Sequence, residues 1–315
     1  MTFGFVFPGQ GSQSVGMLAA LAAAAGAESV IRDTFAEASA VLGYDLGQLV
    51  AQGPAERLNS TECTQPAMLA ASIATWRLWH ARGGADPAVV CGHSLGEFSA
   101  LVAAGALDFA AAVELVRFRG RAMQEAVPAG SGAMAAILGL EDAQLIEACR
   151  EAAEGAIVEA VNFNAPGQVV IAGARAAVER AIEVAKRLGA KRALVLPVSV
   201  PAHSSLMRAA AARLGERLAM IDVRPPRIRF VSAVDASIHE DPADLRQLLV
   251  RQLSSPVRWS QTVRALAASG VGALIECGPG KVLSALNRRI ERSLEALALE
   301  DAASLEAALT TTRAQ

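Results

Sequence analysis

The stretch AVVCGHSLGEFSALVAAGAL, residues 88–107, decides the fold that this sequence predicts. Its first four residues are apolar and suit a short buried strand, whereas the following residues have helical periodicity and contain no proline. Between the two segments lies Gly92-His93-Ser94-Leu95-Gly96, a match to the motif GxSxG. A serine in this context stands on a tight turn from strand to helix, where side chains in place of the glycines would collide. The stretch therefore predicts a nucleophilic Ser94 at the end of a sheet strand.

Further apolar runs extend this pattern along the chain. Strands are predicted at 3–7 (FGFVF), 228–232 (IRFVS) and 273–277 (ALIEC), and amphipathic helices at 28–42 and 65–82. Strands that alternate with helices favour a parallel sheet covered on both faces. The predicted fold class is therefore α/β, with a large domain whose mainly parallel sheet is covered by helices, similar to a hydrolase core.

The middle of the chain has a different order of elements. From Met134 to Val198 the predicted order is strand, helix, strand, strand, helix and strand. That β-α-β-β-α-β order is typical of a ferredoxin-like unit. We therefore predict an inserted ferredoxin-like small subdomain over residues 128–199, within a large α/β hydrolase-like domain formed by 1–127 and 200–315. The Ala- and Thr-rich tail after about residue 300 is expected to be partly loose.

The composition limits the classes of function. Of 315 residues 53% are hydrophobic, the formal net charge is -2 and the pI is about 6.1, so a basic field for nucleic acid is absent. The first residues lack the features of a signal peptide, and no apolar segment is long enough to span a bilayer. Four scattered cysteines without a CxxC pair fit a reducing compartment and argue against a zinc ribbon. We expect a cytoplasmic protein with no metal and no cofactor.

The base for Ser94 must come from only four histidines. His80 ends a predicted helix, and His239 lies in the polar stretch SIHED, where we expect a solvated loop. His93 is expected to point away from its neighbour Ser94. His203 follows a predicted strand and precedes a helix, where loops gather at a strand end, so we predict that it is the general base. No acid after it lies in a recognisable triad motif, so a backbone or amide oxygen could orient its imidazole.

Eight short motifs in a fixed order connect the chain with a known family. They are FPGQGSQ (7–13), TQPA (64–67), GHSLGE (92–97), RGRAM (119–123), NFNAPGQVVIAG (162–173), SVPAHSSLM (199–207), QLSSPVRW (252–259) and GPGKVL (278–283). In this order they resemble the bacterial malonyl-CoA:acyl-carrier-protein transacylases, the FabD-like group of acyltransferases. Each motif is modest by itself, and the shared order over nearly the whole chain makes the resemblance specific.

The resemblance implies a role for each matching residue of the catalytic centre. Ser94 would be the acylated nucleophile and His203 the general base and acid. Gln252 would orient His203 through its backbone oxygen, which accounts for the missing acid.

Other matching residues would bind the substrate. The backbone N–H groups of Gln10 and Leu95 would form the oxyanion hole. Arg119 would hold the malonyl carboxylate, because a guanidinium fork pairs with a carboxylate at two points and lysine matches that geometry less well. Asn162 lies in a motif that lines the cleft.

The activity that the resemblance implies is a ping-pong transfer of malonyl from malonyl-CoA to the phosphopantetheine thiol of acyl carrier protein, through malonyl-Ser94. The expected pathway is fatty-acid biosynthesis, and the expected state is a monomer that binds neither membrane nor nucleic acid. Several alternatives stay open: a polyketide-type acyltransferase or a malonate-decarboxylase subunit, a serine esterase, and an inactive module that binds carrier protein. A preference for methylmalonyl also stays open.

A local basic surface should receive the carrier protein, which is typically acidic. Two groups are candidates for contact with carrier protein or with the phosphates of CoA: Lys186, Arg187, Lys191 and Arg192, or Arg288, Arg289 and Arg292.

Overall fold

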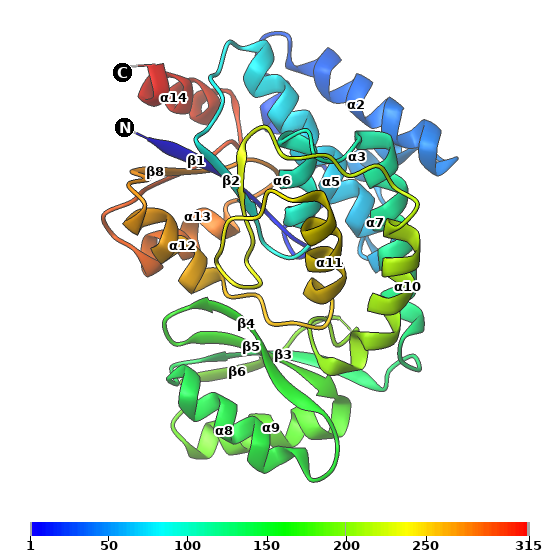
Figure 1. Ribbon diagram of the computed structural model, residues 1–315, viewed down its shortest axis with the longest axis vertical. Coiled ribbons are helices and arrows are strands. Elements are labelled where there is room, and N and C mark those ends of the chain that lie inside the picture. The colour runs from blue at the N-terminus through cyan, green and yellow to red at the C-terminus, as the bar shows by residue number, and fades with distance from the viewer. Residues whose placement is uncertain (1, 199, 314–315) are drawn as a thin grey trace.

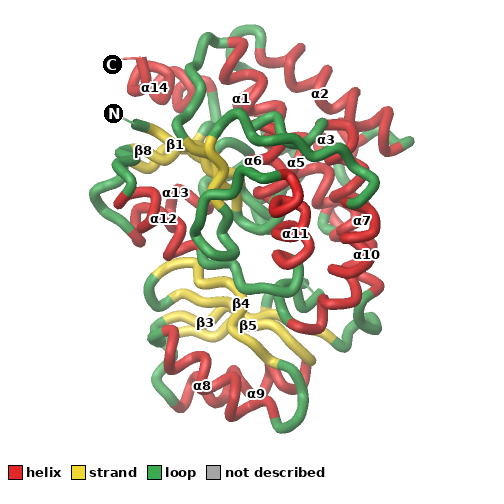
Figure 2. The backbone as a smooth tube through the Cα atoms, in the orientation of Figure 1, coloured by secondary structure: helices red, strands yellow, loops and turns green. Residues whose placement is uncertain are grey.

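The computed structural model describes residues 2–198 and 200–313, and two sheets organise it (Figure 1 and Figure 2). The larger sheet has the strand order β7-β2-β1-β8-β9, and every neighbouring pair is parallel. Its strands are β1 (Phe3–Phe7), β2 (Val89–Gly92), β7 (Arg229–Val231), β8 (Ala273–Glu276) and β9 (Glu295–Ala298). The predicted α/β fold with a mainly parallel sheet is confirmed.

Helices cover both faces of this sheet because its strands point alternate side chains into two apolar cores. Phe5 and Phe7 of β1 belong to one core, and Val6 between them belongs to the other. The first core is shared with α2 (Ala27–Leu42), α5 (Thr61–Ala81), α6 (Gly96–Ala103), α7 (Phe109–Glu125), α10 (Arg208–Leu218) and α11 (Pro242–Gln252). The second is shared with α12 (Trp259–Ala268) and α13 (Val282–Ile290).

The other helices outside the smaller sheet and its two helices are short, except for the last one. They are α1 (Ala19–Ala22), α3 (Leu46–Gln52), α4 (Ala55–Leu58), the 3-10 turn η1 (Ser205–Met207) and α14 (Ala302–Arg313). Within residues 2–198 and 200–313, none of the helices combines the length and the apolar character needed to cross a membrane.

The expectation of a partly loose tail is wrong for residues 302–313, whereas residues 314–315 lie outside the described residues. Residues 302–313 form α14, in which Leu305, Ala308 and Leu309 are buried. These side chains recur at a spacing of three to four residues, so they share one face of the helix. Burial of that face against the large core outweighs the low helix propensity of the threonines.

The smaller sheet is antiparallel, with the strand order β4-β5-β3-β6. Its strands are β3 (Gly132–Leu138), β4 (Val158–Ala165), β5 (Gln168–Ala174) and β6 (Arg192–Val195). Helices α8 (Asp142–Ala153) and α9 (Arg175–Arg187) pack together on one face, as Figure 1 shows. The predicted β-α-β-β-α-β order is confirmed. The domain boundaries at 127/128 and 199/200 stay a prediction, and Ser199 lies outside the described residues.

Strand β4 joins the two sheets into one body. The backbone N–H of Val257 donates to Val161 O at 2.8 Å, and the N–H of Phe163 donates to Val257 O at 2.9 Å. Val257 therefore pairs with the edge of β4 just before α12 begins. The small subdomain is therefore held against the connection between α11 and α12.

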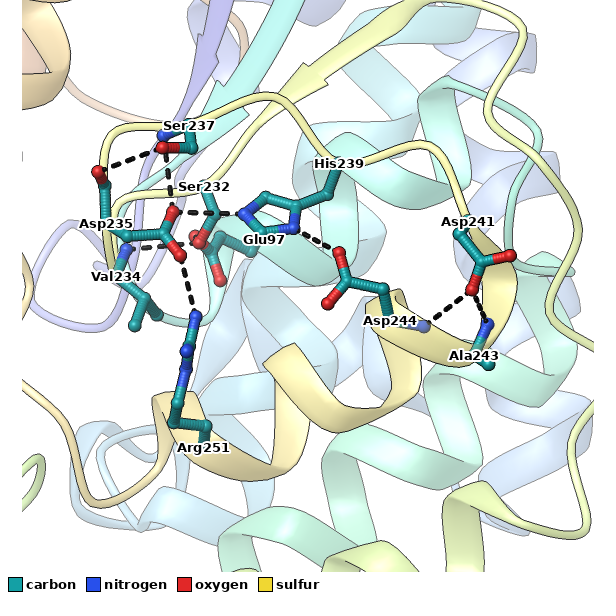
Figure 3. A network of polar contacts seen from close by, with 10 residues as sticks. All are labelled: Glu97, Ser232, Val234, Asp235, Ser237, His239, Asp241, Ala243, Asp244 and Arg251. Atoms are coloured by element: carbon teal, nitrogen blue, oxygen red, sulfur yellow. Dashed lines mark hydrogen bonds and ion pairs between the residues drawn. The ribbon is translucent and has the colours of Figure 1, made fainter.

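The loop between β7 and α11 is clamped by His239, shown in Figure 3. Its imidazole contacts Asp235 Oδ1 at 3.0 Å and Asp244 Oδ2 at 2.5 Å, and its side chain is only 10% exposed. Arg251 completes the cluster with an ion pair to Asp235 at 2.6 Å. The expectation that His239 is a solvated loop residue is wrong, because the fold brings two carboxylates to its ring.

The charge of this imidazole makes the clamp sensitive to pH. Burial by itself lowers the pKa of His239, but its bonds to Asp244 and Asp235 more than offset burial and raise the pKa above its ordinary value. A raised histidine pKa stabilises the fold fully below the unfolded value of about 6.5, and this contribution is lost as the pH rises through the folded value.

We expect His239→Asn to lower the free energy of unfolding by about 1–2 kcal/mol at pH 6, because two charge-assisted bonds weaken. The deficit should shrink at pH 9, where the native imidazole has lost its proton. Urea denaturation of both proteins at the two pH values measures the change. A deficit of equal size at both pH values would contradict a charged clamp.

Candidate active site

The turn between β2 and α6 carries Ser94 in a strained conformation. Its φ is 53°, in the left-handed region that non-glycine residues rarely adopt. A Cβ on Gly92 would lie 2.0 Å from the carbonyl carbon of Gly96, and a Cβ on Gly96 would lie 2.0 Å from Phe7 O. Any larger residue would collide at either position. Because both glycines lack a Cβ, the backbone can turn this sharply and present the serine hydroxyl at the strand end.

His203 contacts the nucleophile directly. The distance from Ser94 Oγ to His203 Nε2 is 2.7 Å. On the other side of the ring, Nδ1 lies 2.9 Å from Gln252 O and 3.1 Å from Ser255 O. Carbonyl oxygens can only accept, so Nδ1 carries the proton and Nε2 is left to accept the proton of Ser94.

The electrostatic surroundings keep His203 neutral. Its side chain is buried, and burial together with the positive charge of Arg119 lowers its pKa to about 3. A neutral imidazole is the form that can act as a base. The carbonyls of Gln252 and Ser255 take the place that a carboxylate has in a triad. No motif or spacing indicates the contact of Ser255.

Arg119 of α7 places a positive charge beside the hydroxyl. Its Nη2 lies 3.3 Å from Ser94 Oγ and 3.0 Å from Gln252 Oε1, and the guanidinium carbon lies 5.5 Å from the centre of the Phe98 ring. The residue is 1% exposed. Burial lowers its pKa to about 10, with Glu97 opposing the shift, so the group stays charged at neutral pH.

The neighbours of Arg119 on the same helix behave differently. Arg117 and Arg121 both pair with Glu62 near the surface. Arg119 forms no ion pair with any residue in the described ranges, and its buried Nε has no hydrogen-bond partner there. A buried guanidinium with donors to spare, next to a nucleophile, suits a carboxylate on the acyl group.

Backbone N–H groups at the elbow are available for an oxyanion. Leu95 opens α6, and the loop with Gln10 follows β1, which pairs with β2 through Phe7 and Gly92. Within the described residues, the N–H groups of Gln10 and Leu95 have no backbone or side-chain acceptor. Two such donors suit a developing negative charge: one precedes the first residue of α6, and the other is in the loop whose Gly9 lies against His93 of the turn.

The strand β4 contributes amide side chains. Asn162 has a buried Oδ1 that no donor of the described chain reaches. Asn164 Oδ1 lies 2.8 Å from Nε2 of His93, whose ring packs 5.6 Å from that of Trp259. His93 bonds to Asn164 of β4 and so links the elbow to the small subdomain. That its side chain points away from Ser94 stays a prediction.

A cavity of about 490 Å³ lies behind His203. Its lining includes Ser254 and Pro256, which flank the carbonyl of Ser255 that accepts from Nδ1. Its charged walls are Arg150, Glu159, Arg208 and Arg258. Ser94 and Arg119 do not line it, so this cavity borders the base and not the nucleophile.

A serine and a neutral imidazole at a strand-to-helix turn define an enzyme that acylates its own serine. Residues 4–309 match the family model described as acyl transferase domain. The chain belongs to this family of acyltransferases, and within it to the malonyl CoA-acyl carrier protein transacylases, as the eight motifs indicated.

Curated relatives and solved structures carry that name. The malonyl CoA-acyl carrier protein transacylase of Salmonella typhimurium is 57% identical over 98% of this chain and 99% of its own length. That of Bacillus subtilis is 45% identical over 98% and 96%. The acyl carrier protein S-malonyltransferase of Vibrio cholerae superposes with a TM-score of 0.94 at 56% identity, covering 98% and 100% of the chains. A malonyl-transacylase in complex with its type II PKS acyl-carrier protein has a TM-score of 0.96 at 54% identity, covering 99% and 100%.

The low pKa of His203 predicts how acylation depends on pH. We expect the single-turnover rate of Ser94 acylation to fall less than twofold from pH 8 to pH 5, because the base stays unprotonated. With an ordinary pKa of about 6.5 the same rate would fall roughly 30-fold. Rapid-quench measurement of the acyl-enzyme at both pH values separates the two cases, and a large drop would contradict the buried neutral imidazole.

Proposed function

We propose that this chain transfers the malonyl group of malonyl-CoA to the phosphopantetheine thiol of acyl carrier protein by a ping-pong reaction through malonyl-Ser94. One observation carries the proposal: the hydroxyl of Ser94 lies between a neutral base at 2.7 Å and an unpaired guanidinium at 3.3 Å. The base serves thioester chemistry, and the guanidinium selects an acyl group that ends in a carboxylate.

In the first half-reaction the malonyl carboxylate pairs with Arg119, which directs the thioester carbonyl toward Ser94. His203 Nε2 takes the hydroxyl proton while Oγ attacks the carbonyl carbon. The oxyanion accepts from the N–H groups of Gln10 and Leu95. Collapse of this intermediate breaks the C–S bond, and His203 returns the proton to the thiolate of CoA.

The second half-reaction runs the same steps with a new thiol. His203 takes the proton of the carrier's phosphopantetheine thiol, and its sulfur attacks malonyl-Ser94. The carbon–oxygen bond breaks, Oγ recovers its proton from His203, and malonyl leaves as a thioester on the carrier. The carbonyls of Gln252 and Ser255 stabilise the imidazolium in both halves.

The same geometry weighs against a serine esterase. A hydrolase of this motif uses an acid to orient its histidine, whereas His203 is held by two carbonyls. An esterase would also leave the buried charge of Arg119 without a purpose. The names of the relatives support transfer to acyl carrier protein, and fatty-acid biosynthesis is the pathway we propose. We also propose a cytoplasmic monomer that does not bind nucleic acid, which fits the net charge of -2.

We place the carrier on the basic group of Arg288, Arg289 and Arg292. Arg289 donates to Gln168 Oε1 at 2.6 Å, at the start of β5 and close to the end of β4 that carries the asparagines. None of the three arginines forms an ion pair with a described carboxylate, so their charges are available. In the other group, Lys186 and Arg187 are neutralised by Glu183 and Glu151.

Intact-mass spectrometry tests the reaction. After mixing with malonyl-CoA, the native protein should gain one malonyl group and lose it when carrier protein is added. Ser94→Ala should gain none, because it removes the hydroxyl that contacts Nε2 of the base. In Arg119→Ala the rate of malonyl-Ser94 formation should fall at least tenfold, whereas the rate of acetylation by acetyl-CoA should be no lower than in the native protein. Equal losses of malonyl and acetyl would argue against a carboxylate site.

Charge reversal tests the docking group. Arg289→Glu should slow transfer from malonyl-Ser94 to carrier protein by about tenfold at low salt, since a favourable charge becomes repulsive. Malonylation of Ser94 by malonyl-CoA should stay within twofold of the native rate. Arg187→Glu in the other basic group is the matched control. If the control slows transfer and Arg289→Glu does not, the carrier docks elsewhere.

A further inference from the structure

A second carboxylate-centred network lies beneath the site, and the mechanism above does not use it. Glu97 is in the first turn of α6 and is 0% exposed. Its Oε1 accepts from Ser232 Oγ at 2.7 Å and from the N–H of Ala233 at 2.6 Å, and its Oε2 accepts from Gln252 Nε2. Burial raises the pKa of this carboxyl, and these donors oppose the shift. All three groups donate to Glu97, which is the pattern that an ionised carboxylate satisfies.

Gln252 transmits this contact to the site. Its Nε2 donates to Ser94 O at 2.9 Å as well as to Glu97, so its amide oxygen must face the other way. That oxygen accepts from Arg119 Nη2 at 3.0 Å. Arg119 can only donate and Ser94 O can only accept, so the orientation of the amide is fixed by chemistry on both sides.

The end of this hydrogen-bond network that lies farther from Ser94 is anchored as well. Ser232 and Ala233 lie in the loop that follows β7, and Figure 3 shows Glu97 and Ser232 beside the cluster of Asp235, His239 and Arg251. Arg251 immediately precedes Gln252 at the end of α11. Glu97 is therefore bonded to a loop and a helix that are themselves clamped together.

The carboxylate of Glu97 stabilises the buried positive charge of Arg119 without contacting it directly. A guanidinium with no counter-charge is costly to bury, but a carboxylate in direct contact would compete with an acyl carboxylate for it. Glu97 acts on Arg119 across one intervening amide, and its negative charge raises the pKa of Arg119 against the effect of burial. The guanidinium thus keeps both its charge and its free donors.

We propose that Glu97 is a positioning residue that acts through Gln252 to hold the Arg119 guanidinium at Ser94, and so sets the preference for acyl groups that carry a carboxylate. The inference deepens the proposed function and rests on the role of Arg119 in it. Glu97 does not touch the substrate, and its effect is on selectivity and not on the base.

Glu97→Gln tests the proposal with nearly unchanged volume. An amide there has only one acceptor atom for donors on both sides, so either the loop or Gln252 loses its bond. When the Gln252 amide turns, Arg119 faces a donor and moves away from Ser94. We expect kcat/KM for malonyl-CoA to fall at least tenfold, and the acylation rate with acetyl-CoA to fall less than threefold. The flat pH profile between pH 5 and pH 8 should persist, since the backbone oxygen of Gln252 still holds His203.

Glu276→Gln is the matched control. Glu276 is also 0% exposed, and it accepts from the N–H groups of Leu283 and Ser284 at 3.1 and 2.7 Å, at the start of α13. This substitution should lower Tm and leave the ratio of malonyl to acetyl rates within twofold of the native ratio. If Glu97→Gln also leaves that ratio unchanged, the proposal is wrong and Glu97 is only structural.

Glu97→Asp provides a second test if Glu97→Gln does not fold. It keeps a buried carboxylate for the donors of Ser232 and Ala233, but a side chain one methylene shorter cannot also reach Gln252 Nε2. We expect its selectivity for malonyl over acetyl to be at least tenfold below native. Native selectivity in this variant would overturn the proposal. Failure of the native protein to form malonyl-Ser94 at all would instead refute the proposed function.

Discussion

The close approach of Gly96 to Phe7 O is the constraint on which the site depends. Gly96 has no Cβ and can therefore pack against Phe7 O, so β2 turns into α6 within three residues, with Ser94 at a φ of 53°. The turn puts the hydroxyl at the carboxyl ends of the parallel strands and the first N–H groups of α6 beside it. His203, Arg119 and Gln252 come from other elements, and each is placed by its contact with this one residue.

Gln252 connects three functions at the end of α11. Its backbone oxygen accepts from His203, its amide nitrogen donates to Ser94 O, and its amide oxygen accepts from Arg119. Buried polar groups of this kind are stable only when every donor and acceptor has a partner. Here the partners belong to a hydrogen-bond network that continues through Glu97 to a clamped surface loop. Residues far from the substrate therefore help to determine where the guanidinium lies.

Particular residues show how far the sequence could predict this site. His203 could be found because only four histidines exist and one follows a strand. The two carbonyls that orient it could not be found from spacing, because any residue supplies a carbonyl; Gln252 came from the family resemblance and Ser255 was missed. The prediction of a solvated His239 is wrong because its partners Asp235 and Asp244 form a clamp only once the loop folds back on α11. The prediction of a loose tail is wrong for residues 302–313 because the core surface that covers α14 is not visible in the local sequence pattern.

The sequence by itself determined the periodicities, and with them the parallel sheet, the β-α-β-β-α-β insertion and the elbow at Ser94, because these follow from local alternation of apolar residues and from glycines in a short motif. Only the tertiary structure decided the protonation states and charge pairing of the site residues. The low pKa of His203, the unpaired guanidinium of Arg119 and the remote carboxylate of Glu97 result from burial and from distances between elements. Electrostatic energies depend on such distances and on exclusion of water, and neither is encoded in local spacing.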